Sequence, residues 1–131
     1  MVKEIRNAIA VRVEAVSGLS EWPGGEDEIP GLGSFFRVRP VGVPGFRRAG
    51  RSAVNGEIPF TLTLRYQTVP DEPTRLGEVA DNIETVRAAL NTDIDTIVLA
   101  RLSVEDCVYD YTTPGYVTAE MALTALTLLT T

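Results

Sequence analysis

Histidine is absent from the 131-residue chain, and cysteine occurs once, as Cys107. Without histidine, the chain cannot form a Ser-His-Asp triad, a Cys-His pair or the common zinc sites. A single cysteine excludes a disulfide within the chain, and the residue that most often holds a thiolate is missing. The sequence therefore excludes many classes of enzyme and predicts that Cys107 is not a nucleophile.

Long apolar runs are also missing. No segment approaches the ~20 consecutive apolar residues that a membrane-spanning helix needs, and the first nine residues lack the apolar block of a signal peptide. We therefore expect no membrane association and a cytoplasmic location. With 44% hydrophobic and 23% charged residues, the composition is that of one folded domain over residues 1–131.

Motifs for nucleotides and metals are not present. The glycines between residues 24 and 33 are not followed by Gly-Lys-Ser/Thr, so they do not form a phosphate-binding loop. Two groups of acids lack the spacing of a calcium loop, namely Asp93 with Asp95, and Glu105 with Asp106 and Asp110. We expect no metal and no cofactor.

Charge is spread unevenly along the chain, whose net charge is −6. Residues 29–56 contain no acid but five arginines, whereas the residues after Gln67 contain eleven acids and three arginines. The net charge argues against a conventional nucleic-acid binder. The uneven distribution suits identical subunits packed head to tail, with the basic surface of one copy on the acidic surface of the next, although solvated charge would explain it too.

Two segments have the apolar spacing of amphipathic helices. In residues 2–17, isoleucine and valine recur at positions 5, 9, 13 and 16, and Gly18 follows as a candidate C-terminal cap. In residues 75–91, the apolar positions are 76, 79, 83, 86 and 90, and Thr74 is a candidate N-cap. Residues 19–33, which are rich in glycine and proline, are expected to be an exposed loop.

Four segments are typical of β-strands, at residues 34–39, 58–67, 96–104 and 116–128. The clearest is 58–67, in which apolar and polar side chains alternate. The last two are expected to pair as an antiparallel hairpin, separated by the aromatic and acidic stretch 105–115. The element order predicts an α+β fold, in which an antiparallel sheet of about four strands carries both helices on one face.

The glycine-, proline- and arginine-rich residues 41–56 are predicted to form a long extended arm or hairpin between the early strands. Aromatic and arginine side chains are favoured at the centres of interfaces. We therefore predict subunit or partner contacts for Phe46, Arg47, Arg48 and Arg51. For Trp22, burial within its own loop and contact with a partner remain equal alternatives. The second sheet face, with Thr118, Glu120, Ala122 and Thr124, is either wet or covered by neighbouring subunits.

The layout resembles the tail-terminator proteins of long-tailed bacteriophages and the related small proteins of the head-to-tail neck. The resemblance lies in the opening helix VKEIRNAIAVRVEAV, the strands with a long arm, the second helix LGEVADNIETVRAAL and the closing hairpin. It covers most of the chain in the order and length of the elements, and it includes no highly specific sequence motif.

The resemblance implies a non-catalytic virion protein at the junction of tail and neck. Such a subunit forms a ring, expected to be a hexamer, on the last ring of the tail tube protein, stops tube polymerisation and offers a surface to a head-completion or neck protein. DNA would pass through the ring without specific binding, as an acidic lumen allows. The alternatives are a neck connector on the portal side and an unrelated non-catalytic binding domain.

Overall fold

The computed structural model describes residues 2–22, 33–41, 45–48, 53–68, 73–95, 99–110 and 115–130. The elements are helices α1 (Val2–Ser17) and α2 (Pro73–Leu90) and strands β1 (Ser20–Glu21), β2 (Phe35–Pro40), β3 (Gly45–Arg48), β4 (Ala53–Gln67), β5 (Asp93–Asp95), β6 (Leu99–Asp110) and β7 (Tyr116–Thr130). The predicted α+β class is confirmed.

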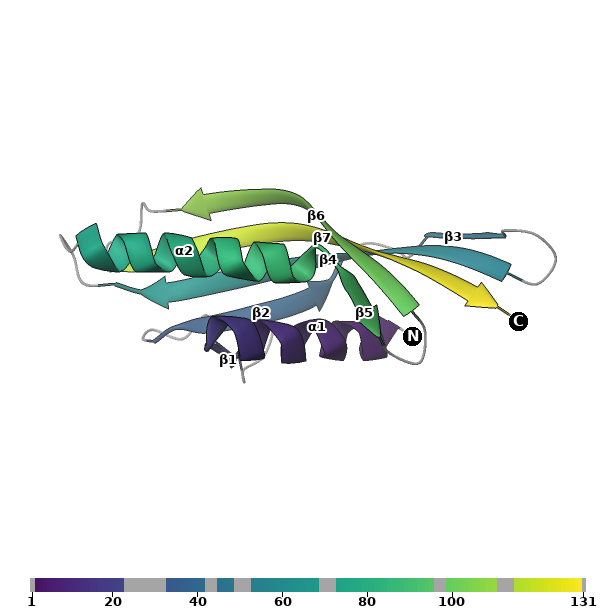
Figure 1. The fold of residues 1–131 in the computed structure, drawn as a ribbon, viewed down its shortest axis with the longest axis horizontal. Helices are drawn as coiled ribbons and strands as arrows, with labels where there is room; N and C mark the ends of the chain where they lie inside the picture. Colours follow the sequence, from purple (N-terminus) through teal and green to yellow (C-terminus); the bar gives the residue numbers. More distant parts are fainter. Residues whose placement is uncertain are drawn as a thin grey trace.

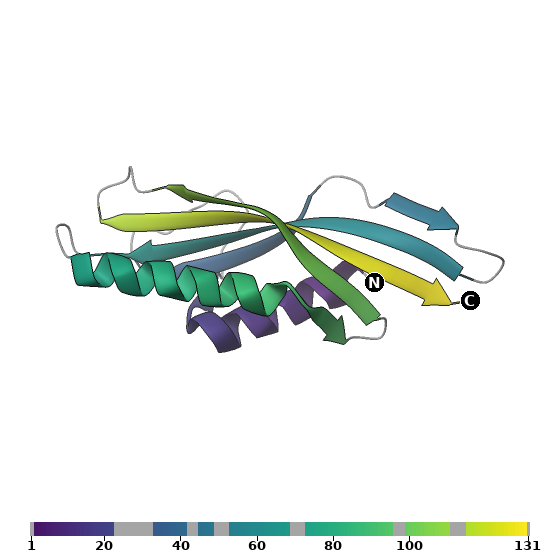
Figure 2. The same cartoon turned by 45° about the horizontal axis from the view of Figure 1, so that its top comes forward.

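The strands form one sheet in the order β1-β2-β4-β7-β6-β5, and β3 pairs with the first part of β4. The long strands β2, β4, β7 and β6 are antiparallel, whereas β1 runs parallel to β2. Both helices lie on the same side of this sheet, as Figure 2 shows. The predicted sheet with two helices on one face is therefore confirmed, and short strands extend both of its edges.

The core lies between the helices and the sheet. Ile5, Ile9 and Val13 of α1 are buried, in keeping with their spacing of four residues. Four of the five apolar positions predicted for α2 are buried as well, but Leu76 is 40% exposed because it lies in the first turn of that helix. In β4, the side chains alternate between buried and half-exposed from Ile58 to Tyr66.

Polar groups fix the helices to the sheet. Asn82 in α2 accepts a hydrogen bond from the hydroxyl of Tyr66 in β4 and donates one to the carbonyl oxygen of Ser17, which ends α1. The guanidinium of Arg12 donates to the carbonyl oxygens of Ala89 and Asp93, at the end of α2 and the start of β5. Each bond of this kind contributes about 1 kcal/mol and sets the relative position of two elements.

Several predicted boundaries differ from the structure; the strand predicted at residues 58–67, for example, begins at Ala53. The helix α2 begins at Pro73, so Thr74 lies in its first turn and is not an N-cap; proline suits this position because the first helical amides have no partner in the helix. Leu19 is buried and β1 follows it, so the predicted loop 19–33 begins later, and residues 23–32 lie outside the described ones.

A further difference concerns β6, which continues to Asp110 where a connecting stretch was expected from residue 105. Its pairing with β7 shifts between Val104 and Asp106, so a bulge takes up one extra residue. Beyond the bulge, Cys107 and Tyr109 pack against the core, while the alternate residues Asp106 and Val108 are exposed.

The sheet extends beyond the helices at one end. Figure 1 shows β3, the start of β4 and the end of β7 continuing past both helices. In this region Phe46 pairs with Gly56 and Arg48 with Val54, which makes β3 and β4 an antiparallel hairpin. We call residues 45–57 the hairpin arm. It occupies the position expected for the arm of residues 41–56.

Candidate binding site on the open sheet face

Neither α1 nor α2 covers the second face of the sheet, which we call the open face (Figure 2). Its side chains are the alternate residues of β2, β4, β7 and β6, most of them half-exposed or exposed. Two large apolar residues are among them, Val108, which is 58% exposed, and Leu126, which is 45% exposed. The face is thus mixed in character, as the sequence predicted for the last strand.

The strand register arranges these side chains in three rows across the sheet. Each row runs from β2 through β4 and β7 to β6, and directly opposed residues are near neighbours. The first row is Phe35, Arg65, Thr118 and Asp110; the second is Arg37, Thr63, Glu120 and Val108; the third is Arg39, Thr61, Ala122 and Asp106. In these rows the arginines lie on β2 and β4, whereas the acids lie on β7 and β6.

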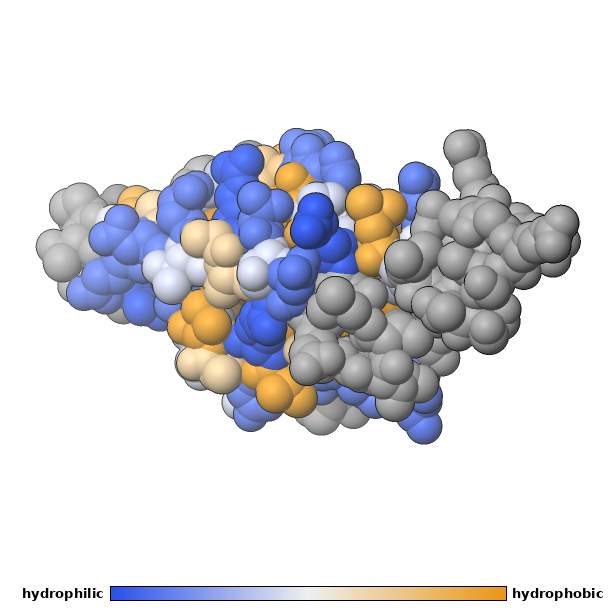
Figure 3. All heavy atoms as spheres, turned by 45° about the vertical axis from the view of Figure 1, so that its right-hand side comes forward, coloured by the Kyte–Doolittle hydropathy of each residue, from blue (hydrophilic) through white to orange (hydrophobic). Residues whose placement is uncertain are grey.

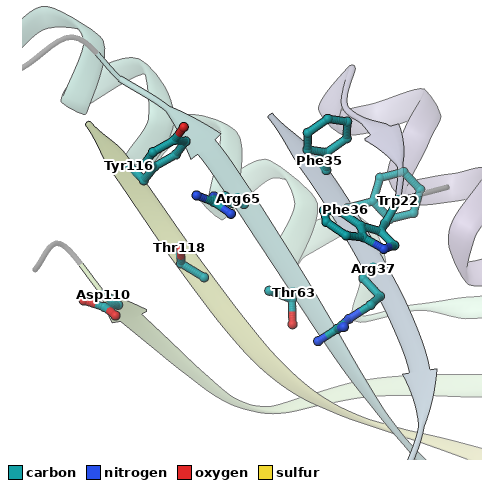
Figure 4. Close-up of a pocket in the computed structure, with 9 residues that line it drawn as sticks. All are labelled: Trp22, Phe35, Phe36, Arg37, Thr63, Arg65, Asp110, Tyr116 and Thr118. Atoms are coloured by element: carbon teal, nitrogen blue, oxygen red, sulfur yellow. The ribbon is translucent and has the colours of Figure 1, made fainter. Parts of the chain in front are cut away.

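A pocket of about 420 Å³ opens at one end of this face, around the first row. Figure 4 shows the residues that line it, which come from five strands or their ends. They are Trp22, Phe35, Phe36, Arg37, Thr63, Arg65, Asp110, Tyr116 and Thr118. The pocket therefore combines aromatic side chains and two arginines on one side with one aspartate on the other.

Trp22 and Phe35 form the aromatic wall. Their rings meet edge to face, with centroids 5.6 Å apart and planes at 82°. The backbone N–H of Trp22 donates to the carbonyl oxygen of Phe36 at 2.8 Å, which continues the pairing of β1 with β2. Gly33 has a φ of +104°, and a Cβ there would come within 2.8 Å of the Phe35 ring. Glycine at position 33 thus permits the position of this wall.

Arg65 and Tyr116 form the second part of the pocket. The guanidinium carbon of Arg65 lies 4.0 Å from the centroid of the Tyr116 ring, on the neighbouring strand. This cation–π contact contributes about 0.5–1 kcal/mol at a partly exposed site. It also orients the guanidinium, whose N–H donors lie in the plane of the group and suit a carboxylate.

No family model matches this chain, and no curated protein matches it.

The residues predicted for contacts are distributed between two regions. Trp22 lies in the pocket, half-buried, so its aromatic surface is in part packed and in part accessible. Phe46, Arg47 and Arg48 lie on β3 in the hairpin arm, and their side chains are outside the described part of the structure. Arg51 lies outside the described residues. The structure does not bring Trp22 together with any described side chain of the arm.

Of the nine residues that line the pocket, only Trp22 was predicted as a site residue; Phe35, Arg65, Asp110 and Tyr116 are four of those that were not. The alternation in the sequence could have indicated Phe35 and Arg65. Every second residue of their strands is buried, and both lie at the positions between the buried ones. A large aromatic ring at such a position indicates a covered or functional face. The four residues lie close together only because of the order of the strands in the sheet, and the alternation of apolar and polar residues does not predict that order.

Cys107 lies on the helix side of β6, away from the pocket, and burial raises the pKa of its thiol. A raised pKa opposes the thiolate that a nucleophile requires. Next to it, the hydroxyl of Tyr109 donates to the carboxylate of Glu84 on α2 at 2.8 Å. Among the described residues, no group of three acids, cysteines or histidines is placed to hold a metal ion.

Within the described residues, neither helix is long and apolar enough to cross a membrane. Figure 3 shows one face of the molecule, on which hydrophobic side chains form separate patches between hydrophilic ones.

Proposed function

We propose that the protein is a structural subunit that assembles head to tail into a ring, and that this ring is the tail terminator of a long-tailed bacteriophage. The observation that carries the proposal is the separation of charge across the open face. Within the three rows, arginines lie on β2 and β4, and acids lie on β7 and β6. The resemblance in element order and the hairpin arm support the same assignment.

A closed head-to-tail ring needs two different surfaces that fit each other. The two sides of this sheet supply them. Arg39 lies on β2, while Asp106 lies on β6 with the neighbouring Glu105. When subunits are placed side by side in a ring, the β2 side of one copy meets the β6 side of the next. Opposite charges then favour this contact and disfavour contact between like sides.

The hairpin arm gives each subunit a longer reach. It extends past the helices (Figure 1), and its sequence carries Phe46, Arg47 and Arg48 in β3 with Arg51 beyond it. Aromatic and arginine residues are those most enriched at interfaces. We assign the arm to contacts with the adjacent subunit or the tail tube.

Termination in this proposal is steric. The lower surface of the ring matches the last ring of the tube, whereas the upper surface differs from it, so that no further tube ring adds. The upper surface is then available to a head-completion or neck protein. Assembly of this kind needs no cofactor and no nucleotide.

The first test is light scattering after size exclusion, on the protein alone and on the protein mixed with tail-tube assemblies. Ring-sized particles, or tubes capped at one end in electron micrographs, are the expected results. A monomer that leaves tube length unchanged but binds portal assemblies would replace the terminator by a neck connector. A monomer that binds neither would overturn the virion assignment.

Two charge reversals test the ring interface itself. Arg39 and Asp106 lie in the third row at opposite sides of the sheet. Arg39→Glu or Asp106→Lys alone should reduce ring formation, because each places like charges at the contact. The double variant should restore self-assembly, since its two sides are again complementary. If the double variant assembles no better than either single variant, the contact is not the one proposed.

A further inference from the structure

The pocket at the end of the open face has a chemistry that ring assembly does not use. Its β1, β2 and β4 side carries the aromatic wall of Trp22 and Phe35 together with Arg37 and Arg65. Its opposite side carries Asp110 at the end of β6. An occupant therefore needs an apolar group for the aromatic wall and an anionic group for the arginines, and Asp110 repels an anion placed on the wrong side.

The spacing of these groups fits an extended polypeptide. Along β2, Phe35 and Arg37 are two residues apart on the same face, which corresponds to about 7 Å at the usual rise of a strand. An extended segment lying along β2 repeats its side chains at the same distance. An aromatic side chain against Trp22 and Phe35 would thus place the side chain two positions later beside Arg37, while Arg65 lies opposite Phe35 on the neighbouring strand β4.

We propose that this pocket binds an extended segment of a partner protein in which an aromatic residue is followed two positions later by glutamate or aspartate. The carboxylate accepts hydrogen bonds from Arg37 and Arg65, and charge-assisted bonds of this kind are stronger than neutral ones. The aromatic ring covers Trp22 and Phe35. The pocket volume of about 420 Å³ is of the size that such a pair of side chains fills.

This inference is independent of the ring. The third-row residues used for ring contacts, Arg39 and Asp106, do not line the pocket. If the protein forms rings but does not bind such a segment, the pocket proposal fails and the ring proposal stands. If it binds the segment but forms no rings, the ring proposal fails and the pocket proposal stands.

Trp22 provides a direct measurement because it is the only tryptophan in the chain. The probe is the capped peptide acetyl-Gly-Phe-Ser-Glu-Gly-amide, whose phenylalanine is not excited at wavelengths that excite tryptophan. Titration with the peptide should move the Trp22 emission to shorter wavelength, because the phenyl ring of the peptide excludes water from the indole. The shift should saturate at high peptide concentration. Matched peptides with Gln in place of Glu, or Ala in place of Phe, should bind about tenfold more weakly.

Variants separate the pocket from the rest of the surface. Arg37→Gln and Arg65→Gln should each weaken binding of the Glu peptide by about tenfold and leave the Gln peptide nearly unchanged. Asp110→Asn should strengthen binding of the Glu peptide, a gain that unfolding cannot produce. Arg101→Gln is the matched control, because Arg101 is exposed on β6, forms an ion pair with Asp93 and is outside the pocket.

Two outcomes would overturn the proposal. In the first, the Glu and Gln peptides bind equally, or neither changes the Trp22 emission up to its solubility limit. In the second, the emission changes with protein concentration alone while light scattering shows a doubled mass, and Arg65→Gln abolishes both effects. The second result would assign the pocket to another copy of this chain instead of a partner segment.

Discussion

Tyr66 is a single side chain that joins three elements. It projects from β4 into the core with 3% of its surface exposed, and its hydroxyl donates to Asn82 on α2, which in turn donates to the end of α1. Burial raises the pKa of the Tyr66 phenol from 10.0 to about 12, because the charged form is disfavoured away from water. The phenol is therefore neutral in the folded protein at pH values where it ionises in the unfolded chain.

This difference predicts a loss of stability at high pH. Between pH 10 and about 12, the unfolded chain releases the Tyr66 proton and the folded chain keeps it, so the free energy of unfolding falls as the pH rises. Below pH 10 the group makes no pH-dependent contribution. Urea unfolding of Tyr66→Phe should show a shallower fall over this range and a cost of about 1 kcal/mol at pH 7 from the lost hydrogen bond.

Tyr109 supplies the comparison for this experiment. Its phenol pKa is also raised, first by burial and then by its hydrogen bond to the Glu84 carboxylate. Tyr109→Phe should therefore also make the free energy of unfolding fall less steeply at high pH, independently of Tyr66→Phe. If wild type and Tyr66→Phe lose stability in parallel above pH 10, the ionisation of Tyr66 is not responsible.

Residue patterns predicted the buried side of the fold better than the pocket on its open face. Alternation in β4 and the spacing of three and four residues in the helices identified most of the core before the structure. The pocket could not be predicted in this way. Phe35, Arg65 and Asp110 are far apart in the sequence, and only the order β2-β4-β7-β6 places them in one row.

At the scale of secondary-structure elements, two glycines provide a matched test. Gly18 ends α1 with a φ of +74°, and its amide donates to the carbonyl oxygen of Glu14, so the predicted C-terminal cap is confirmed. Gly77 lies inside α2. An added Cβ meets no atom within 4 Å at either position, so the effect of alanine depends on backbone conformation alone.

Opposite effects are therefore expected from the same change. Gly18→Ala should lower the free energy of unfolding by about 1 kcal/mol, because a left-handed conformation is costly for a residue with a Cβ. Gly77→Ala should raise it by about 0.5–1 kcal/mol, because alanine loses less entropy in a helix. Thermal and urea unfolding measure both. A stabilising Gly18→Ala would contradict the left-handed cap.

The hairpin arm is the element whose role can be tested without disturbing the core. Replacing Arg47, Arg48 and Arg51 with alanine should weaken ring formation or docking on the tube, while the unfolding free energy changes by no more than about 0.5 kcal/mol. Light scattering and thermal unfolding measure the two effects. The control triple variant replaces Arg75, Arg87 and Arg101, the only arginines after Gln67. Normal docking of the arm variant would show that the arm assignment is wrong.

Element boundaries were predicted less well than the elements themselves. The stretch after residue 105 contains acids and aromatics, which indicated a connection, yet β6 continues through it by means of the bulge between Val104 and Asp106. Its alternation, with Cys107 and Tyr109 toward the core, is only four residues long. The extra residue of a bulge shifts which positions of the strand face the core. The alternation of buried and exposed residues before the bulge therefore does not predict the alternation after it.

At the scale of the whole molecule, the separation of charge predicts how assembly responds to salt. Charged contacts between exposed surfaces weaken as the Debye length falls from about 10 Å at 0.1 M salt to about 3 Å at 1 M. The ring population in sedimentation velocity should fall severalfold over this range. Thermal stability of the subunit should change little, because its core is apolar. Rings that persist unchanged at high salt would favour apolar contacts through Val108 and Leu126.

The place of β7 in the sheet also bears on how the protein is made. This strand follows both β4 and β6 in the sequence but lies between them in the sheet, so it joins two halves of the sheet that have no other strand in common. On the ribosome, neither half can complete its core until β7 has emerged, and long-range pairing of this kind slows folding. The emergence of β7 would then decide when the subunit can join the two halves of its sheet and complete its core.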